Sequence, residues 1–289
     1  MNVKNTKKIL FGIIACVLIA AMGIIIWILL HQKEDETKAE EKLNSLRAYV
    51  TEADEEDTDT TLEVAQKPEI MEELGIHIPN KKIDWQALRK KNKDIYAWLY
   101  IPDTNIDYPI LQHETDNNYY IDHNLDGSKG YPGCITTQVE YNSRDFMDAN
   151  TCIYGHNMKN GSMFQNLHKF EDSLFFKENK FAYIFTPQTT YVYEIFAAYT
   201  FGNALIPYAY DFSTRSGYQE YLDEVYSIRD MKAHFRDGIK VTPQNHIITL
   251  STCTSPADDD HRWLVQGVMV NDPTLTDEEI SAVFSNRAQ

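Results

Sequence analysis

A cysteine, a histidine and an arginine are the residues of this chain whose types and spacing could do chemistry together. Cys253 ends the string Thr-Leu-Ser-Thr-Cys, directly after the apolar run 247–250. Arg262 opens a second apolar run nine positions later, and His156 lies in a Tyr-Gly-His-Asn turn at 154–157. A nucleophile at the end of a buried strand is held rigidly and still reaches solvent. Thiol, imidazole and guanidinium groups together suit acyl transfer through a thioester.

Each of the three residues has a distinct expected role. Cys253 would attack, since a thiol is partly ionised at neutral pH and a nearby cation raises the thiolate fraction. His156 would protonate the leaving amine, because imidazole titrates in the useful range. Arg262 would bind an oxyanion or the substrate backbone through its fixed charge. Ser251 and Thr252 could complete the oxyanion site.

Each assignment has an alternative. Cys253 could be a buried structural thiol, and His261 could replace His156 as the acid/base. Arg262 could pair with the acidic run 258–260 rather than with substrate. Ser251 and Thr252 could satisfy backbone groups at the strand end.

The N-terminus predicts a membrane anchor. Residues 9–30 form an uncharged stretch of 22, which as a helix is long enough to cross a bilayer. Lys4, Lys7 and Lys8 precede the stretch and acids follow it, so the positive-inside rule places residues 1–8 in the cytoplasm. A cleaved signal peptide is the alternative, but the apolar run exceeds the usual length of such a segment. The prediction is a single-pass type II protein with its bulk outside the cell.

An acidic segment follows the anchor. Residues 34–63 hold 12 acidic and 3 basic residues, within a chain of 289 residues whose net charge is −16. Like charges and scarce aromatic residues favour a solvated stalk or a charged helix that packs no core. The sequence has no basic patch of the kind that binds nucleic acid. The expected boundaries are a stalk at 31–80 and one folded domain at 81–289.

The remaining cysteines indicate little reliance on disulfides or metals. Cys16 lies within the apolar stretch, and Cys134 and Cys152 lie in apolar runs typical of buried free thiols, although a bridge between these two is possible. Cys152 and His156 stand four apart, without a second pair of ligands that would mark a zinc site. The acidic run 258–260 lacks the alternating ligands of a calcium loop. We expect no metal and no cofactor.

The folded part reads as mainly β with added helices. Asp84 can cap a helix that runs to about residue 92, Thr276 and Glu279 form a capping-box pattern for a helix at 274–284, and apolar positions repeat at helical spacing over 216–228. Short runs with turn residues between them favour a β-barrel or a sandwich. The expected strands include 97–101, 108–111, 119–121, 133–137, 181–187 and 191–200.

Over residues 83–272 the chain resembles the sortases, the membrane-anchored transpeptidases of Gram-positive surfaces. The resemblance rests on the Thr-Leu-Ser-Thr-Cys string, the downstream Arg262 and the Tyr-Gly-His-Asn turn. It implies a closed β-barrel of about eight strands, with one or more N-terminal helices. The helix expected before the cysteine strand is similar to the insertion of class B sortases.

The resemblance also implies the reaction and its partners. Cys253 would cleave a C-terminal sorting signal of a secreted surface protein, and an amine of a cell-wall precursor would resolve the thioester. Asn117, Ile121 and Tyr210 are candidate substrate contacts by rough position, with barrel packing or loop surface as the alternative. A cysteine endopeptidase that releases the acyl group to water, or an anchored binding module without activity, remain alternatives.

Overall fold

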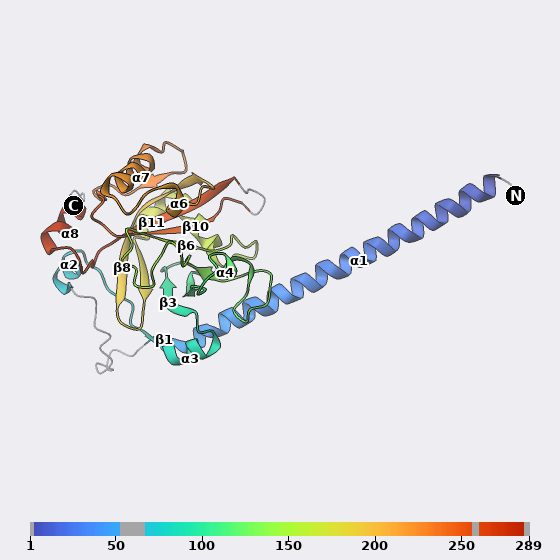
Figure 1. The fold of residues 1–289 in the computed structure, drawn as a ribbon, viewed down its shortest axis with the longest axis horizontal. Coiled ribbons are helices and arrows are strands. Elements are labelled where there is room, and N and C mark those ends of the chain that lie inside the picture. The colour runs from blue at the N-terminus through green and yellow to red at the C-terminus, as the bar shows by residue number, and fades with distance from the viewer. Residues whose placement is uncertain (1–2, 53–66, 256–259, 286–289) are drawn as a thin grey trace.

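A closed β-barrel forms the body of the molecule, and one long helix projects from it (Figure 1). The computed structural model describes residues 3–52, 67–255 and 260–285. Eight strands follow each other around the barrel in the order β11-β10-β6-β5-β4-β3-β7-β8, and pairing of β11 with β8 closes it. The predicted closed barrel of about eight strands is thereby confirmed.

The barrel is mixed, because β10 runs parallel to β6 and β4 runs parallel to β5. A short strand, β9 (His234–Phe235), adds to β8, and β1 (Val50–Glu52) pairs with β2 (Lys81–Ile83) in a separate ribbon. The barrel strands are β3 (Ile95–Tyr100), β4 (Asp107–Leu111), β5 (Ile135–Thr136), β6 (Asn150–Tyr154), β7 (Phe181–Phe185), β8 (Thr190–Gly202), β10 (Ile247–Cys253) and β11 (His261–Met269).

Three helices of the domain lie where the sequence pattern predicted them. α3 (Trp85–Lys91) is capped by Asp84, whose carboxylate accepts from the Ala87 amide, and α8 (Asp277–Phe284) carries the predicted capping box. The inserted helix before the cysteine strand is α7 (Arg215–Ser227). The others are α1 (Val3–Ser45), η1 (Leu46–Tyr49), α2 (Pro68–Glu73), α4 (Tyr119–Asp122), η2 (Phe164–Glu171), α5 (Ser173–Glu178) and α6 (Ile206–Ala209).

The strand predicted at 119–121 is wrong, because these residues form the single helical turn α4. Tyr119 stacks between the rings of His113 and His123, and the buried Tyr120 bonds through its hydroxyl to Asp94. These aromatic contacts fit a helical turn better than an extended run. A short helix leaves its last carbonyls without intrahelical partners.

A buried polar network holds three barrel strands in register. The Gln266 amide of β11 donates to the Thr249 hydroxyl of β10 at 2.7 Å, and that hydroxyl donates to Asn150 of β6 at 2.8 Å. The Tyr199 hydroxyl of β8 donates to Gln266 at 2.7 Å, and Gln266 donates to Tyr221 of α7 at 2.6 Å. Buried polar groups are costly when unpaired, so a strand slip that broke these bonds would be strongly unfavourable.

The folded core begins before Lys81, which differs from the expected stalk at 31–80. Ala39, Leu43 and Leu46 are buried at helical spacing, and the two leucines belong to the main core. The acidic composition conceals this stripe, since its few apolar positions all face one side. Residues 53–63, the most acidic part of the expected stalk, lie outside the described residues.

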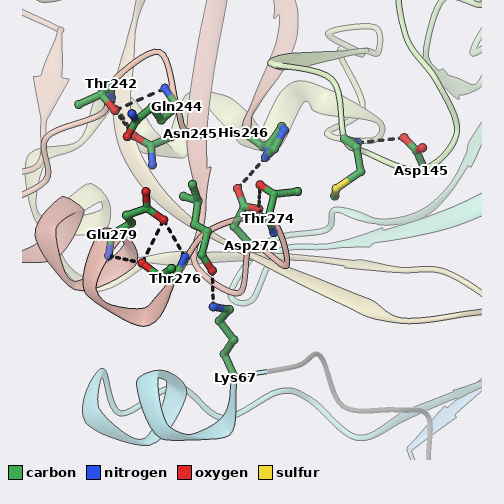
Figure 2. A network of polar contacts seen from close by, with 12 residues as sticks. Lys67, Asp145, Thr242, Gln244, Asn245, His246, Asp272, Thr274, Thr276 and Glu279 are labelled. Carbon is green, nitrogen blue, oxygen red and sulfur yellow. Dashed lines mark hydrogen bonds and ion pairs between the residues drawn. The ribbon is translucent and has the colours of Figure 1, made fainter.

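The segment after the acidic run also joins the domain. Ile70 and Met71 of α2 are buried in the core. Figure 2 shows Lys67 reaching the Leu275 carbonyl just before α8, and the same ammonium pairs with Asp277 at 2.8 Å. Nearby in Figure 2, the His246 ring bonds to the buried Asp272 at 2.6 Å.

We expect a chain that begins at Lys81 to be less stable than one that begins at Glu36. Removal of Leu43, Leu46 and Ile70 exposes the surfaces that they cover, and each buried aliphatic side chain contributes about 1.5–3 kcal/mol. The free energy of unfolding should fall by at least about 3 kcal/mol, measured by urea denaturation with tryptophan fluorescence. Equal denaturation midpoints would show that the earlier segment adds nothing to the core.

Candidate active site

Strand pairing brings Cys253 and Arg262 together. β10 and β11 are antiparallel, and Cys253, the last residue of β10, stands directly opposite Arg262. Residues opposite each other in an antiparallel pair project to the same face of the sheet, with Cβ atoms about 5 Å apart. The side chain of Cys253 is half-buried. The thiol and the guanidinium therefore share one face at the rim of the barrel.

The parallel pairing of β6 with β10 adds His156. Tyr154, the last residue of β6, is level with Ser251, and the Gly155 amide donates to the Ser251 carbonyl at 3.2 Å. Gly155 has to be glycine, because a Cβ there would lie 2.5 Å from the Ile135 side chain and 2.9 Å from the Phe164 ring. The close packing of Gly155 places His156 at the edge where β10 ends.

A cavity of about 680 Å³ is lined by Cys253, Arg262 and His156. Ser251, Thr252 and Ile121 line it as well, so these predicted positions also lie at the site. The Thr252 hydroxyl, however, donates to the Gly155 carbonyl at 2.8 Å. Its observed role is to tie β10 to the histidine turn.

Two predicted substrate contacts lie elsewhere among the described residues. Asn117 bonds to Glu140 through both its amide groups, and its neighbour Asn118 lines the cavity instead. Tyr210 packs against Tyr221 and bonds to Glu224, outside the cavity lining. Position along the chain was too coarse to separate Asn117 from Asn118.

A backbone carbonyl near the C-terminal end of α4 holds His156. Its Nε2 donates to the Ile121 carbonyl at 2.6 Å, a group that the single-turn helix leaves without a helical partner. Burial lowers the pKa of His156, and the hydrogen bond to Ile121 opposes that shift. The Tyr131 ring lies edge-on at 4.9 Å and covers one side of the imidazole. With Nε2 occupied, Nδ1 is the nitrogen that remains for proton transfer.

A hydrogen-bonded chain that the sequence analysis missed connects the histidine turn to the cysteine. His168 donates from Nδ1 to Glu171 at 2.6 Å, and its Nε2 lies 3.0 Å from the Cys253 carbonyl, an oxygen that can only accept. The Asn157 amide donates to the same Cys253 carbonyl at 3.0 Å. Asn157 adjoins His156, so this chain links the two candidate catalytic positions. Asn157 and His168 lie 96 and 85 positions from Cys253 in the sequence, and no local pattern marks them.

The alternatives weighed for each residue find less support. Cys134 and Cys152 are free and buried, and burial raises the pKa of both thiols, that of Cys152 to about 12. His261 is exposed and adjoins Arg262 on the strand, so its side chain points to the opposite face. Two of the acids considered as partners of Arg262, Asp258 and Asp259, lie outside the described residues.

Comparison with known proteins identifies the family. Residues 99–270 match the sortase domain model. Sortase B of Listeria monocytogenes is 39% identical over 184 residues, covering 63% of this chain and 72% of the relative. Sortase B of Staphylococcus aureus is 27% identical over 181 residues, covering 62% and 71%.

Solved structures agree with this assignment. A mutant form of Clostridium perfringens sortase B superposes with a TM-score of 0.56 at 31% identity, covering 64% of this chain and 85% of that one. A Staphylococcus aureus sortase B–substrate complex gives 0.55 at 25% identity, covering 70% and 89%. The chain belongs to the sortase family, in class B, and is a cysteine transpeptidase by type.

We expect Glu171→Gln to lower kcat about tenfold or more while the peptide KM stays within about twofold. A neutral glutamine removes the charged acceptor of Nδ1 and so loosens the ring whose Nε2 contacts the Cys253 carbonyl. Ring ¹⁵N shifts of His168 should report the lost contact between Nδ1 and the carboxylate. Lys232→Gln is the control, because Lys232 pairs with the other oxygen of the same carboxylate at 2.7 Å on the exposed side. Equal kcat in both variants would refute the positioning role.

NMR titration should place the pKa of His156 below 6.5, and Tyr131→Ala should raise it, because solvent then reaches the ring. Between the folded-state value and 6.5 the folded chain binds fewer protons than the unfolded chain. Its free energy of unfolding should therefore decrease as pH falls through that range. A His156 pKa above 6.5 in the wild type would contradict the observed burial.

Proposed function

We propose that this protein is a membrane-anchored sortase that cleaves a C-terminal sorting signal and transfers the acyl group to an amine of a cell-wall precursor. The observation that carries the proposal is the placement of Cys253 opposite Arg262, with His156 at the end of the neighbouring strand, around one cavity. Membership of the sortase family supports the sorting-signal substrate.

In the first step, the thiol proton of Cys253 passes to His156. The low pKa of His156 keeps the ring neutral at pH 7 and able to accept that proton. The thiolate attacks the carbonyl carbon of the scissile peptide bond, and Arg262 stabilises the oxyanion. The C–N bond then breaks, His156 protonates the leaving amine, and the acyl group remains on the sulfur as a thioester.

In the second step, an amine attacks the thioester carbonyl. The C–S bond breaks, the new amide forms, and the proton of the amine passes to the neutral His156 and then restores the Cys253 thiol. Hydrolysis uses water in place of the amine at the same point. The endopeptidase and the transferase therefore differ only in the acceptor.

The proposed anchor is the N-terminal part of α1. By length and composition this helix can cross a membrane, with a mean hydropathy of 3.1 over its most apolar window, none of which is buried. Lys4, Lys7 and Lys8 before the apolar stretch support a cytoplasmic N-terminus and a domain outside the cell. The expected partners are then secreted proteins and cell-wall precursors at the outer face of the cell membrane.

Intact mass measurement tests this function. The full chain in detergent is incubated with NPQTN-, LPXTG- and PPXTG-type peptides, and then with an added amine. We expect an adduct on Cys253 that the amine removes as a conjugate. Release of the acyl group at a rate that the amine does not change would indicate an endopeptidase. A reactive Cys253 that forms no adduct with any peptide would favour a binding module.

Cys253→Ala should abolish the adduct and leave the free energy of unfolding within about 1 kcal/mol of wild type, because a strand-end thiol buries little surface. Cys16→Ala is the matched control and should retain full activity. Turnover by the Cys253 variant would refute the mechanism.

Arg262→Lys should reduce kcat/KM by about a hundredfold, because lysine keeps the charge and loses the planar pair of donors. Steady-state kinetics with the acylating peptide measures this effect, and Arg229→Lys, at an exposed position outside the cavity, serves as control. A near-normal rate would assign Arg262 to a structural contact.

A further inference from the structure

The docked end of α1 lies against the candidate active site. One face of α1 is covered by the domain, and its positions recur at helical spacing. The half-buried or buried residues on this face are Glu36, Ala39, Glu40 and Leu43. In Figure 1 the same helix continues away from the barrel to the N-terminus. One continuous element therefore runs from the proposed membrane span to the domain.

Two contacts fix α1 to the loops around His156. Glu40 accepts from the Asn160 amide at 2.6 Å, in the loop that follows the histidine turn. Lys42 pairs with Asp126, in the loop that follows α4, whose Ile121 carbonyl holds the imidazole. The helix thus bridges the two loops that position His156.

Glu36 is the point at which α1 reaches the cavity itself. Lys159 and Arg262 are the cations of the lining, and Glu36 is its one carboxylate among the described residues. Within those residues the structure gives Glu36 no hydrogen bond and no ion pair. Glu36 is half-buried at the cavity wall, where its carboxylate can contact a ligand.

We propose that Glu36 forms an acceptor subsite, where its carboxylate binds the ammonium group of the incoming amine; this rests on the proposed transferase function. Two substrates use the cavity in turn. The oxyanion and the carbonyl groups of the acyl donor are complementary to Arg262 and Lys159, whereas the ammonium group of the acceptor is complementary to the carboxylate of Glu36.

The place of Glu36 along α1 agrees with this role. Glu36 is six residues after Leu30, the last residue of the apolar stretch, which is about 9 Å along a helix. Glu36 therefore lies close to the end of the proposed membrane span. An acceptor that arrives along the membrane surface meets Glu36 before it meets the thioester.

The contact should affect binding of the amine rather than its attack. A carboxylate favours the protonated ammonium, which has no free lone pair, so the amine has to leave Glu36 and lose a proton before it attacks. Glu36 then raises the local concentration of acceptor at the cavity. The effect should appear in the KM for the amine, and salt should weaken it.

The test is aminolysis of the Cys253 thioester by the full chain in detergent, with an NPQTN-type peptide as donor. Triglycine amide serves as a cationic acceptor, and hydroxylamine serves as an acceptor that is uncharged at neutral pH. In Glu36→Gln we expect the KM for triglycine amide to rise about two- to fivefold, with unchanged kcat and unchanged KM for hydroxylamine. Glu36→Lys should raise it further.

Glu41→Gln is the matched control, because Glu41 lies on the exposed side of the same helix and should behave as wild type. In the wild type, added salt should raise the KM for triglycine amide toward that of the Gln variant. An equal KM for triglycine amide in wild type and Glu36→Gln, with normal acylation, would overturn the subsite alone. A wild-type thioester that reacts only with water would overturn the transferase function and the subsite with it.

Discussion

The pairing of β10 with β11 is the constraint on which the site depends. It sets Cys253 opposite Arg262, and the side-chain period of two means that a slip by one residue would turn one of them to the other face. The Gln266–Thr249–Asn150 hydrogen bonds oppose such a slip and extend the same register to β6, which delivers His156. The nucleophile and the cation thus project from paired strands, and the acid/base follows two residues after the end of a third strand.

Local patterns were sufficient for the parts of the site that lie on strands. The apolar runs before Cys253 and after Arg262 identified two strand ends, and the resemblance to sortases supplied the barrel that joins them. Polar contacts between distant segments could not be predicted in this way. His168 and Glu171 stand in a connection without a motif, and their relation to Cys253 exists only after the barrel has closed.

The stalk expectation shows how composition can mislead. Between residues 34 and 52 six acidic residues outnumber three basic ones, yet Leu43 and Leu46 form part of an apolar stripe that is buried in the core. A hydrophobic stripe needs only about one residue per turn, so a high net charge does not exclude packing. The same docking brings Glu36 to the cavity, which makes the helix that leads from the proposed anchor part of the site rather than a spacer.

The most direct test of this account is a crystal structure of the protein with a sorting-signal peptide aldehyde trapped on Cys253. The account predicts a tetrahedral adduct whose oxygen accepts hydrogen bonds from the Arg262 guanidinium, with the His156 imidazole on the side from which the amine would leave. An adduct whose oxygen points away from Arg262, or whose leaving-group side is remote from Nδ1 of His156, would contradict it.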